Sequence, residues 1–116
     1  MKIAIIGTGY VGLVSGACFA EFGHEVTCID KDETKINVLK NSEIPIYEPS
    51  LEFLVHKNMK AGRLVFSTEF SPGVPEAEVI FIAVGTPASR RGDGYADLSY
   101  VYEAAHQLAP HLQDYT

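Results

Sequence analysis

The chain has 116 residues, a length that accommodates one domain with a single hydrophobic core. Apolar residues make up 47% and charged residues 21%, which is typical of a globular protein and argues against an intrinsically disordered one. The net charge of −6 argues against nucleic acid and acidic membranes as partners. No apolar run approaches the ~20 residues of a membrane span, and no signal-peptide pattern is present, so we expect a cytoplasmic protein.

The first expected element is a buried strand that leads through a glycine-rich turn into a helix. Residues 3–6 form a β-rich apolar run that is too short for a helix, as in a parallel strand buried on both faces. Gly7, Gly9 and Gly12 follow with the spacing GxGxxG. Apolar residues then recur every three or four positions, as on one face of a helix, until Gly23, where a left-handed cap is expected to end it.

Each glycine of this turn has a separate predicted task. Gly7 permits the tight turn, Gly9 lets a phosphate approach the backbone, and Gly12 lets the helix pack closely on the strand. The free N–H groups at the start of the helix then face a pyrophosphate. A second strand, residues 26–29, leads into Asp30, at about the 20-residue distance where a ribose-binding carboxylate is expected. The sequence therefore predicts a dinucleotide site.

Asp30 also indicates which nicotinamide cofactor binds. A carboxylate at this position accepts hydrogen bonds from the adenosine ribose hydroxyls and repels the additional phosphate of NADP. Lys31 and Lys35 favour the alternative, because a nearby cation attracts that phosphate. The balance favours NAD.

The rest of the chain continues the alternation of helices and strands. We first expect a helix over 32–40 with Ile36 and Leu39 inward, then a loop over 41–50, and then a helix that has Pro49 in its first turn and is closed by Gly62. A strand over 64–67 and a short or distorted helix within 71–76 follow. The last expected elements are a strand buried on both faces over 78–84 and a helix with Asp97 as its N-cap. The inward stripes of the third and last helices are expected to be Leu51, Leu54, Val55 and Met59, and Leu98, Val101, Tyr102, Ala105 and Leu108.

This order predicts a doubly wound α/β fold of the Rossmann type. Right-handed crossovers leave few arrangements other than a parallel sheet with strand order 3-2-1-4. The crevice beyond the carboxyl ends of the first and fourth strands is then the topological switch point, where loops 7–12 and 85–97 meet. We expect the dinucleotide to lie there.

The chain resembles the UDP-glucose/GDP-mannose 6-dehydrogenase family, and within it the members that act on UDP-glucose, in four segments that occur in order: GTGYVG, CIDKDETKI, PIYEPSL and FIAVGTPASRRGDGYADLSYV. This family oxidises the C6 alcohol of a nucleotide sugar to a carboxylate in two successive hydride transfers to NAD. The resemblance implies that the backbone around Tyr10 and Val11 binds the pyrophosphate and that Asp30 and Lys35 hold the adenosine ribose. It implies further cofactor contacts in the turn after the fourth strand, at Val84, Gly85, Thr86 and Pro87.

The resemblance also implies that the catalytic residues of the family lie after residue 116. We therefore expect residues 1–116 to be an NAD-binding Rossmann domain that ends before its fifth strand, lacks the catalytic and UDP-sugar-binding domains, and is inactive alone. The UDP-sugar substrate would bind only the full-length protein, which we expect to be a homo-oligomer. Cys18 on the buried helix face and Cys28 inside a strand are not expected to be nucleophiles or, given their spacing, metal ligands.

Three alternatives stay open. The first is another nucleotide-sugar 6-dehydrogenase, acting on GDP-mannose or a UDP-N-acetylhexosamine. The second is a non-enzymatic NAD-sensing regulatory domain, although YEPSL and DGYADLSYV have no expected role in that class. The third is a different hydride-transfer enzyme, such as a 3-hydroxyacyl-CoA or 6-phosphogluconate dehydrogenase.

Overall fold

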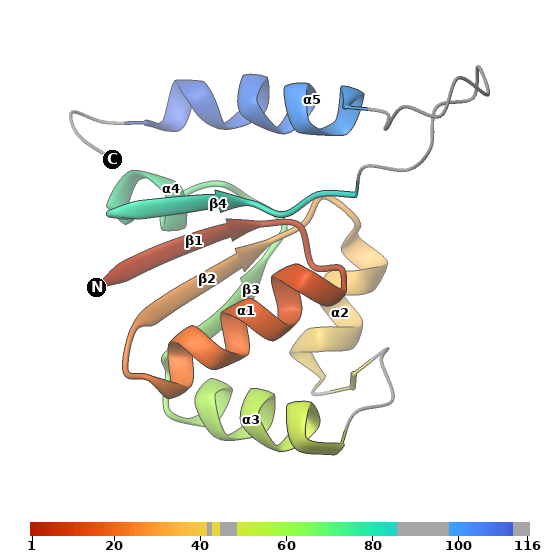
Figure 1. The fold of residues 1–116 in the computed structure, drawn as a ribbon, viewed down its shortest axis with the longest axis vertical. Helices are drawn as coiled ribbons and strands as arrows, with labels where there is room; N and C mark the ends of the chain where they lie inside the picture. Colours follow the sequence, from red (N-terminus) through yellow and green to blue (C-terminus); the bar gives the residue numbers. More distant parts are fainter. Residues whose placement is uncertain (42, 45–48, 86–97, 113–116) are drawn as a thin grey trace.

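The structure, a computed structural model, describes residues 1–41, 43–44, 49–85 and 98–112. These residues form a four-stranded parallel sheet with the order β3-β2-β1-β4, which confirms the predicted topology (Figure 1). The strands are β1 (Lys2–Ile6), β2 (Glu25–Ile29), β3 (Leu64–Ser67) and β4 (Val79–Ile82). The helices are α1 (Tyr10–Glu21), α2 (Glu33–Lys40), α3 (Pro49–Lys60), α4 (Gly73–Glu76) and α5 (Ser99–Leu108), followed by a short 3-10 helix, η1 (Ala109–His111).

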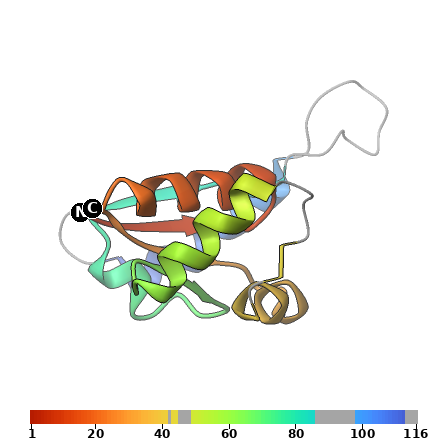
Figure 2. The same ribbon diagram turned by 90° about the horizontal axis from the view of Figure 1, so that it is seen from below.

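The strand β1 lies in the middle of the sheet and is buried on both faces, as predicted. Side chains alternate along a strand, so Ile3 and Ile5 enter the apolar cluster formed with α1, α2 and α3, while Ala4 and Ile6 enter the cluster formed with α4 and α5. The helices α1 and α3 lie side by side on the first of these faces (Figures 1 and 2). The two faces of β1 therefore anchor both helical layers.

The predicted helix ends are confirmed where the structure describes them. Gly23 has a φ of +103°, and the N–H groups of Gly23 and His24 donate to the carbonyls of Ala20 and Phe19, which closes α1. The side chain of Asp32 accepts hydrogen bonds from the N–H groups at the start of α2. Pro49 is the first residue of α3, as predicted. The helix α4 is a single turn, as expected for a segment with two prolines.

The strand β4 is shorter and more exposed than predicted. The expected strand over 78–84 was to be buried on both faces, whereas β4 spans four residues and Phe81 and Ile82 are 42% and 40% exposed. Among the described residues β4 pairs only with β1, so it lies at the edge of this sheet and less surface packs against it.

The inward face of α5 also differs from the prediction. Ala104 and Leu108 are buried, whereas Leu98, Tyr102 and Ala105 of the predicted stripe are exposed. Asp97 lies outside the described residues, and the N-cap position belongs to Leu98, whose side chain makes no capping hydrogen bond. The helix contacts the sheet along a narrow line next to Phe70 and Ile80, because only two of its side chains reach that layer fully.

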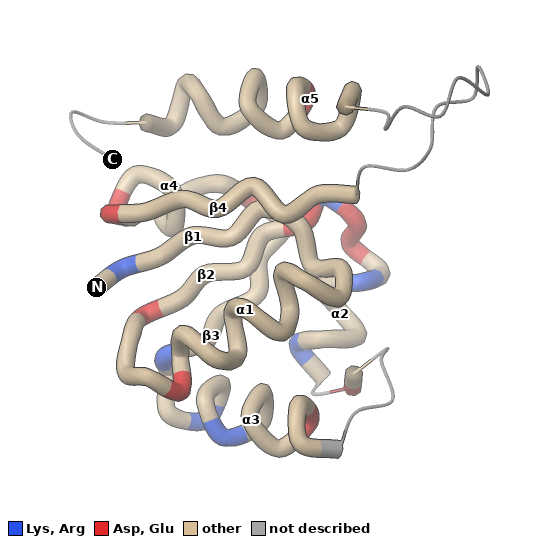
Figure 3. Tube along the Cα trace, viewed as in Figure 1, with Lys and Arg blue, Asp and Glu red and all other residues tan. Residues whose placement is uncertain are grey.

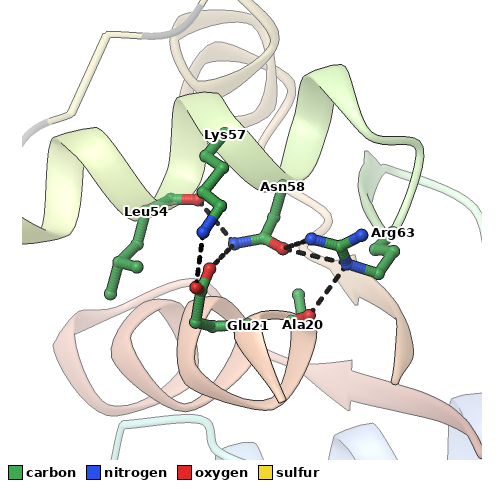
Figure 4. Close-up of polar contacts among 6 residues, drawn as sticks. All are labelled: Ala20, Glu21, Leu54, Lys57, Asn58 and Arg63. Carbon is green, nitrogen blue, oxygen red and sulfur yellow. Dashed lines mark hydrogen bonds and ion pairs between the residues drawn. The ribbon is translucent and has the colours of Figure 1, made fainter. Parts of the chain in front are cut away.

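A buried polar cluster, here called the Asn58 network, joins α1, α3 and the start of β3 (Figure 4). The Nδ2 of Asn58 donates to Glu21 Oε2 at 2.9 Å, and its Oδ1 accepts from Arg63 Nε and Nη2 at 3.1 and 2.8 Å. Arg63 Nε also donates to the carbonyl of Ala20. Lys57 forms an ion pair with Glu21 at 2.7 Å at the exposed side of the cluster. Asn58 is 0% exposed, so its polar groups are satisfied entirely within the protein.

Candidate dinucleotide-binding site

A cavity of about 500 Å³ lies at the carboxyl ends of β1 and β4, at the predicted switch point. Its walls come from the glycine turn after β1, from the chain that follows β2, β3 and β4, and from one side of α5. Figure 1 shows why these segments meet: all four strands run in the same direction, so the turns that follow them gather at one end of the sheet. The volume is within the ~300–1,000 Å³ of small-molecule sites.

The glycine turn has the steric properties predicted for two of its positions. Gly7 has a φ of +108°, and a Cβ placed on it would lie 2.6 Å from the carbonyl oxygen of Ala83, so only glycine fits this turn. A Cβ on Gly12 would overlap the carbonyl oxygen of Gly7, which explains how closely α1 packs on β1. A Cβ on Gly9 would meet no atom within 4 Å. The backbone at Gly9 therefore borders open space in the cavity wall.

The start of α1 offers uncapped backbone next to this opening. Gly9 occupies the N-cap position, no side chain caps the helix, and its first turn has no acidic residue. Tyr10 and Val11 do not line the cavity, and their side chains are 60% and 66% exposed. Their N–H groups nevertheless follow directly on Gly9, where the positive end of the helix dipole favours an anion.

Asp30 is the half-buried acid of the cavity. Its Oδ2 accepts hydrogen bonds from the N–H and the hydroxyl of Thr8, at 3.1 and 2.8 Å, and its Oδ1 accepts from the N–H of Asp32 at 3.0 Å. Burial by itself raises the pKa of this carboxyl, but these hydrogen bonds and the charge of Lys35 outweigh it and lower the pKa below the usual value. Asp30 is therefore ionised and held in one orientation at neutral pH.

Thr8 is a site residue that the sequence analysis missed. It is only 3% exposed, and it binds Asp30 through both its backbone and its hydroxyl. It stands at a variable position of GxGxxG, where the motif itself specifies no side chain. The one available signal was a hydroxyl residue beside two glycines, which is too common to single out.

The two lysines after β2 have different partners. Lys35 lines the cavity and acts on Asp30 through its charge. Lys31 also lines the cavity, but its Nζ lies 2.7 Å from Oε1 of Glu103, on α5. Charged residues of both signs crowd the chain where it leaves β2 and enters α2 (Figure 3). The sequence predicted that both lysines lie near the ribose site, but it did not predict that Glu103 pairs with Lys31.

The remaining predicted site residues belong to the turn after β4. Val84 and Gly85 line the cavity, beside the glycine turn. Thr86 and Pro87 lie outside the described residues. The side of α5 that lines the cavity carries Tyr100, Glu103 and Gln107, none of which the sequence assigned to the site.

The described residues offer neither a reactive thiol nor a metal centre at the cavity. Cys28 is fully buried in β2, and burial raises its pKa to about 12. Cys18 is half-buried on α1. Within the described ranges, no three His, Cys, Asp or Glu residues are grouped so that they could hold a metal ion, and no helix is long and apolar enough to cross a membrane.

These features fit a dinucleotide. Open backbone at Gly9 and an uncapped helix start suit a pyrophosphate, and an ionised, oriented carboxylate after β2 suits a ribose diol. The fold and the cavity together define a Rossmann-type nucleotide-binding domain.

The chain belongs to the UDP-glucose/GDP-mannose dehydrogenase family, because residues 1–116 match the model of that family's NAD binding domain. It is 60% identical over 116 residues to UDP-glucose 6-dehydrogenase of Rhizobium meliloti, covering 100% of the chain and 26% of that relative. It is 54% identical over 114 residues to UDP-glucose 6-dehydrogenase TuaD of Bacillus subtilis, covering 98% of the chain and 24% of that relative. The chain thus spans about a quarter of the length of these curated relatives.

Solved structures of the family have the same fold. A ternary complex of GDP-mannose dehydrogenase from Pseudomonas aeruginosa matches with a TM-score of 0.86 at 39% identity, covering 93% of this chain and 24% of that one. A UDP-glucose dehydrogenase from Pyrobaculum islandicum matches with a TM-score of 0.86 at 37% identity, covering 94% of this chain and 25% of that one.

Proposed function

We propose that residues 1–116 are the NAD-binding part of a UDP-glucose 6-dehydrogenase, which as a whole protein oxidises UDP-glucose to UDP-glucuronate with two NAD. The family and the 60% identity to a relative of that name support the reaction and the sugar, with GDP-mannose and UDP-N-acetylhexosamines as the alternative substrates. The structural observation that carries the cofactor assignment is Asp30, ionised and fixed by Thr8 at the wall of the cavity.

In this proposal the residues of the chain bind and orient NAD, and NAD supplies the hydride acceptor. The backbone from Gly9 through Tyr10 and Val11 to Gly12 receives the pyrophosphate, because the uncapped start of α1 adjoins the open space at Gly9. Gly7 contributes by shaping the turn, since its own N–H donates to the carbonyl of Ile29. Asp30 and Lys35 hold the adenosine ribose. The turn after β4 borders the remaining part of the cofactor through Val84, Gly85, Thr86 and Pro87.

The oxidation itself needs a nucleophile and proton-transfer groups that this part of the protein is not proposed to supply. Cys28 is excluded as a thiolate nucleophile at neutral pH because burial raises its pKa to about 12. We therefore expect the chain by itself to bind cofactor and not to turn over UDP-glucose. We predict that the whole protein is a cytoplasmic homo-oligomer. The net charge of −6 of this chain argues against nucleic acid and acidic membranes as its partners.

Titration calorimetry of the chain with NAD and with NADP tests the cofactor assignment. NAD should bind more tightly, and Asp30→Ala should weaken NAD binding and narrow the difference between the two cofactors. Asp32→Asn is the matched control: it neutralises a carboxylate two residues away that does not line the cavity, and asparagine also caps helices well. Tighter binding of NADP, or an equal effect of both substitutions, would contradict the proposal.

A further inference from the structure

The rim of the cavity beside Asp30 carries an ion pair between segments that are far apart in the sequence. Lys31, which follows β2, donates from Nζ to Oε1 of Glu103 on α5 at 2.7 Å. The same Oε1 accepts a hydrogen bond from Nε2 of Gln107, one turn further along α5, at 3.1 Å. Two donors therefore fix the carboxylate of Glu103 on the cavity side of α5, and all three residues line the cavity.

The position of Lys31 makes its partner important for the choice of cofactor. Asp30 is proposed to bind the adenosine ribose, and NADP differs from NAD by a phosphate on that ribose. An unpaired ammonium next to Asp30 would attract the phosphate and offset the repulsion by the carboxylate. The described wall of the cavity carries two lysines, Lys31 and Lys35, against two carboxylates, Asp30 and Glu103. Removing the charge of Glu103 would leave this wall with a net positive charge.

We propose that Glu103 is a specificity-determining residue, which favours NAD over NADP by engaging Lys31 and by adding a second negative charge beside the adenosine ribose. This inference rests on the proposed function of the cavity. The glycine motif and Asp30 both lie outside α5. The inference therefore gives α5 a role of its own in selecting the cofactor.

Either residue of the ion pair can be substituted with little expected effect on the stability of the fold. The side chains of Lys31 and Glu103 are 66% and 46% exposed, and exposed ion pairs contribute little to the stability of a fold. The variant Glu103→Gln keeps the shape of the side chain and an oxygen that accepts from Lys31 or Gln107. We therefore expect it to fold as the unsubstituted chain does, which far-UV circular dichroism checks.

The test is a titration of the chain and of Glu103→Gln with NAD, NADP and the fragment pair adenosine 5′-monophosphate and adenosine 2′,5′-bisphosphate. We expect Glu103→Gln to bind the two ligands with a 2′-phosphate about five- to tenfold more tightly, as for one ammonium–phosphate contact in a solvated site, and to bind NAD and the monophosphate within about twofold of the original affinity. The double variant Lys31→Met/Glu103→Gln should lose most of this gain.

Glu76→Gln is the matched control, because Glu76 is an exposed carboxylate paired with Lys2 at 3.6 Å and does not line the cavity. It should change no affinity. If the unsubstituted chain binds NAD but Glu103→Gln gains nothing for the 2′-phosphate ligands, the inference is wrong and the proposed function stands. A gain that persists in the double variant would overturn the role of Lys31. If the unsubstituted chain binds neither dinucleotide, the proposed function fails and the inference with it.

Discussion

Replacing Asn58 by leucine should destabilise the fold strongly without touching the cofactor cavity. Asn58 is fully buried and makes four hydrogen bonds: its Nδ2 donates to Glu21 and to the carbonyl of Leu54, and its Oδ1 accepts twice from Arg63 (Figure 4). Leucine has the same branching at Cγ but neither donates nor accepts. Asn58→Leu therefore removes the centre of the network and leaves its charged neighbours in place.

The expected loss follows from the partners that remain. A hydrogen bond contributes about 0.5–1.5 kcal/mol net, and a buried polar group left without a partner costs about 1–3 kcal/mol. Arg63 keeps its bond to the carbonyl of Ala20 and Glu21 keeps Lys57, so the four bonds of Asn58 do not add in full. We expect Asn58→Leu to lower the free energy of unfolding by about 2–4 kcal/mol, a large part of the roughly 5–15 kcal/mol of a typical domain.

Urea unfolding measures this loss. The chain has no tryptophan, so far-UV circular dichroism is the suitable signal. With a slope of about 2 kcal/mol per molar urea, in the middle of the usual range, the midpoint should fall by about 1–2 M. Lys57→Gln is the control, because it removes only the exposed partner of Glu21 and should shift the midpoint much less. A midpoint for Asn58→Leu as close to the original as that of Lys57→Gln would refute the reasoning, since the network would then contribute no net stability.

Three further predictions concern the acid of the site, the glycine turn and the buried thiol of β2. Because the native pKa of Asp30 is lowered from 3.8, its ionisation stabilises the fold above about that pH, and this stabilisation is lost as the pH falls through the lower native value. Thr8→Val should raise this pKa and weaken the acid dependence, whereas Thr8→Ser should preserve both, as measured by carboxyl carbon NMR titration. Gly12→Ala should lower the melting temperature by several degrees through backbone overlap, while Gly9→Ala should leave it nearly unchanged and weaken NAD binding. Cys28 should react with a chromogenic thiol reagent only after the chain unfolds, because its thiol is buried. The time course of the absorbance of the released chromophore measures this.

The parts of the fold that the sequence predicted are those set by local chemistry. An apolar run with no polar position indicates burial on both faces, which β1 has. The glycine spacing is set mostly by local requirements: Gly7 adopts a positive φ, and a Cβ on Gly12 would overlap the carbonyl oxygen of Gly7 five residues earlier. The strand order followed because right-handed crossovers restrict the connections between parallel strands.

The parts that the sequence did not predict depend on which surfaces meet in three dimensions. The run over 78–84 is as apolar as β1, yet Phe81 and Ile82 are half-exposed because β4 lies at an edge of the sheet that the described residues form. Asn58 continues the inward face of α3 three residues after Val55, but a polar residue there gives no sign of its partners, Glu21 on α1 and Arg63 just before β3. Glu103 meets Lys31 only because α5 packs beside the turn after β2. No pattern of neighbouring residues in the sequence predicts any of these contacts.

The hydrogen bonds of Asp30 explain why one carboxylate would not suffice for the proposed ribose contact. A carboxylate has about four acceptor positions, and three are occupied: two on Oδ2 by Thr8 and one on Oδ1 by the N–H of Asp32. One position on Oδ1 remains for a ribose hydroxyl. The second hydroxyl of the diol then needs another polar group at the same wall, and Lys35 lines the cavity with three donors and lies near enough for its charge to act on Asp30. In the proposed site, the hydrogen bonds from Thr8 to Oδ2 are therefore the reason that Lys35 of α2 is expected to share ribose recognition with Asp30.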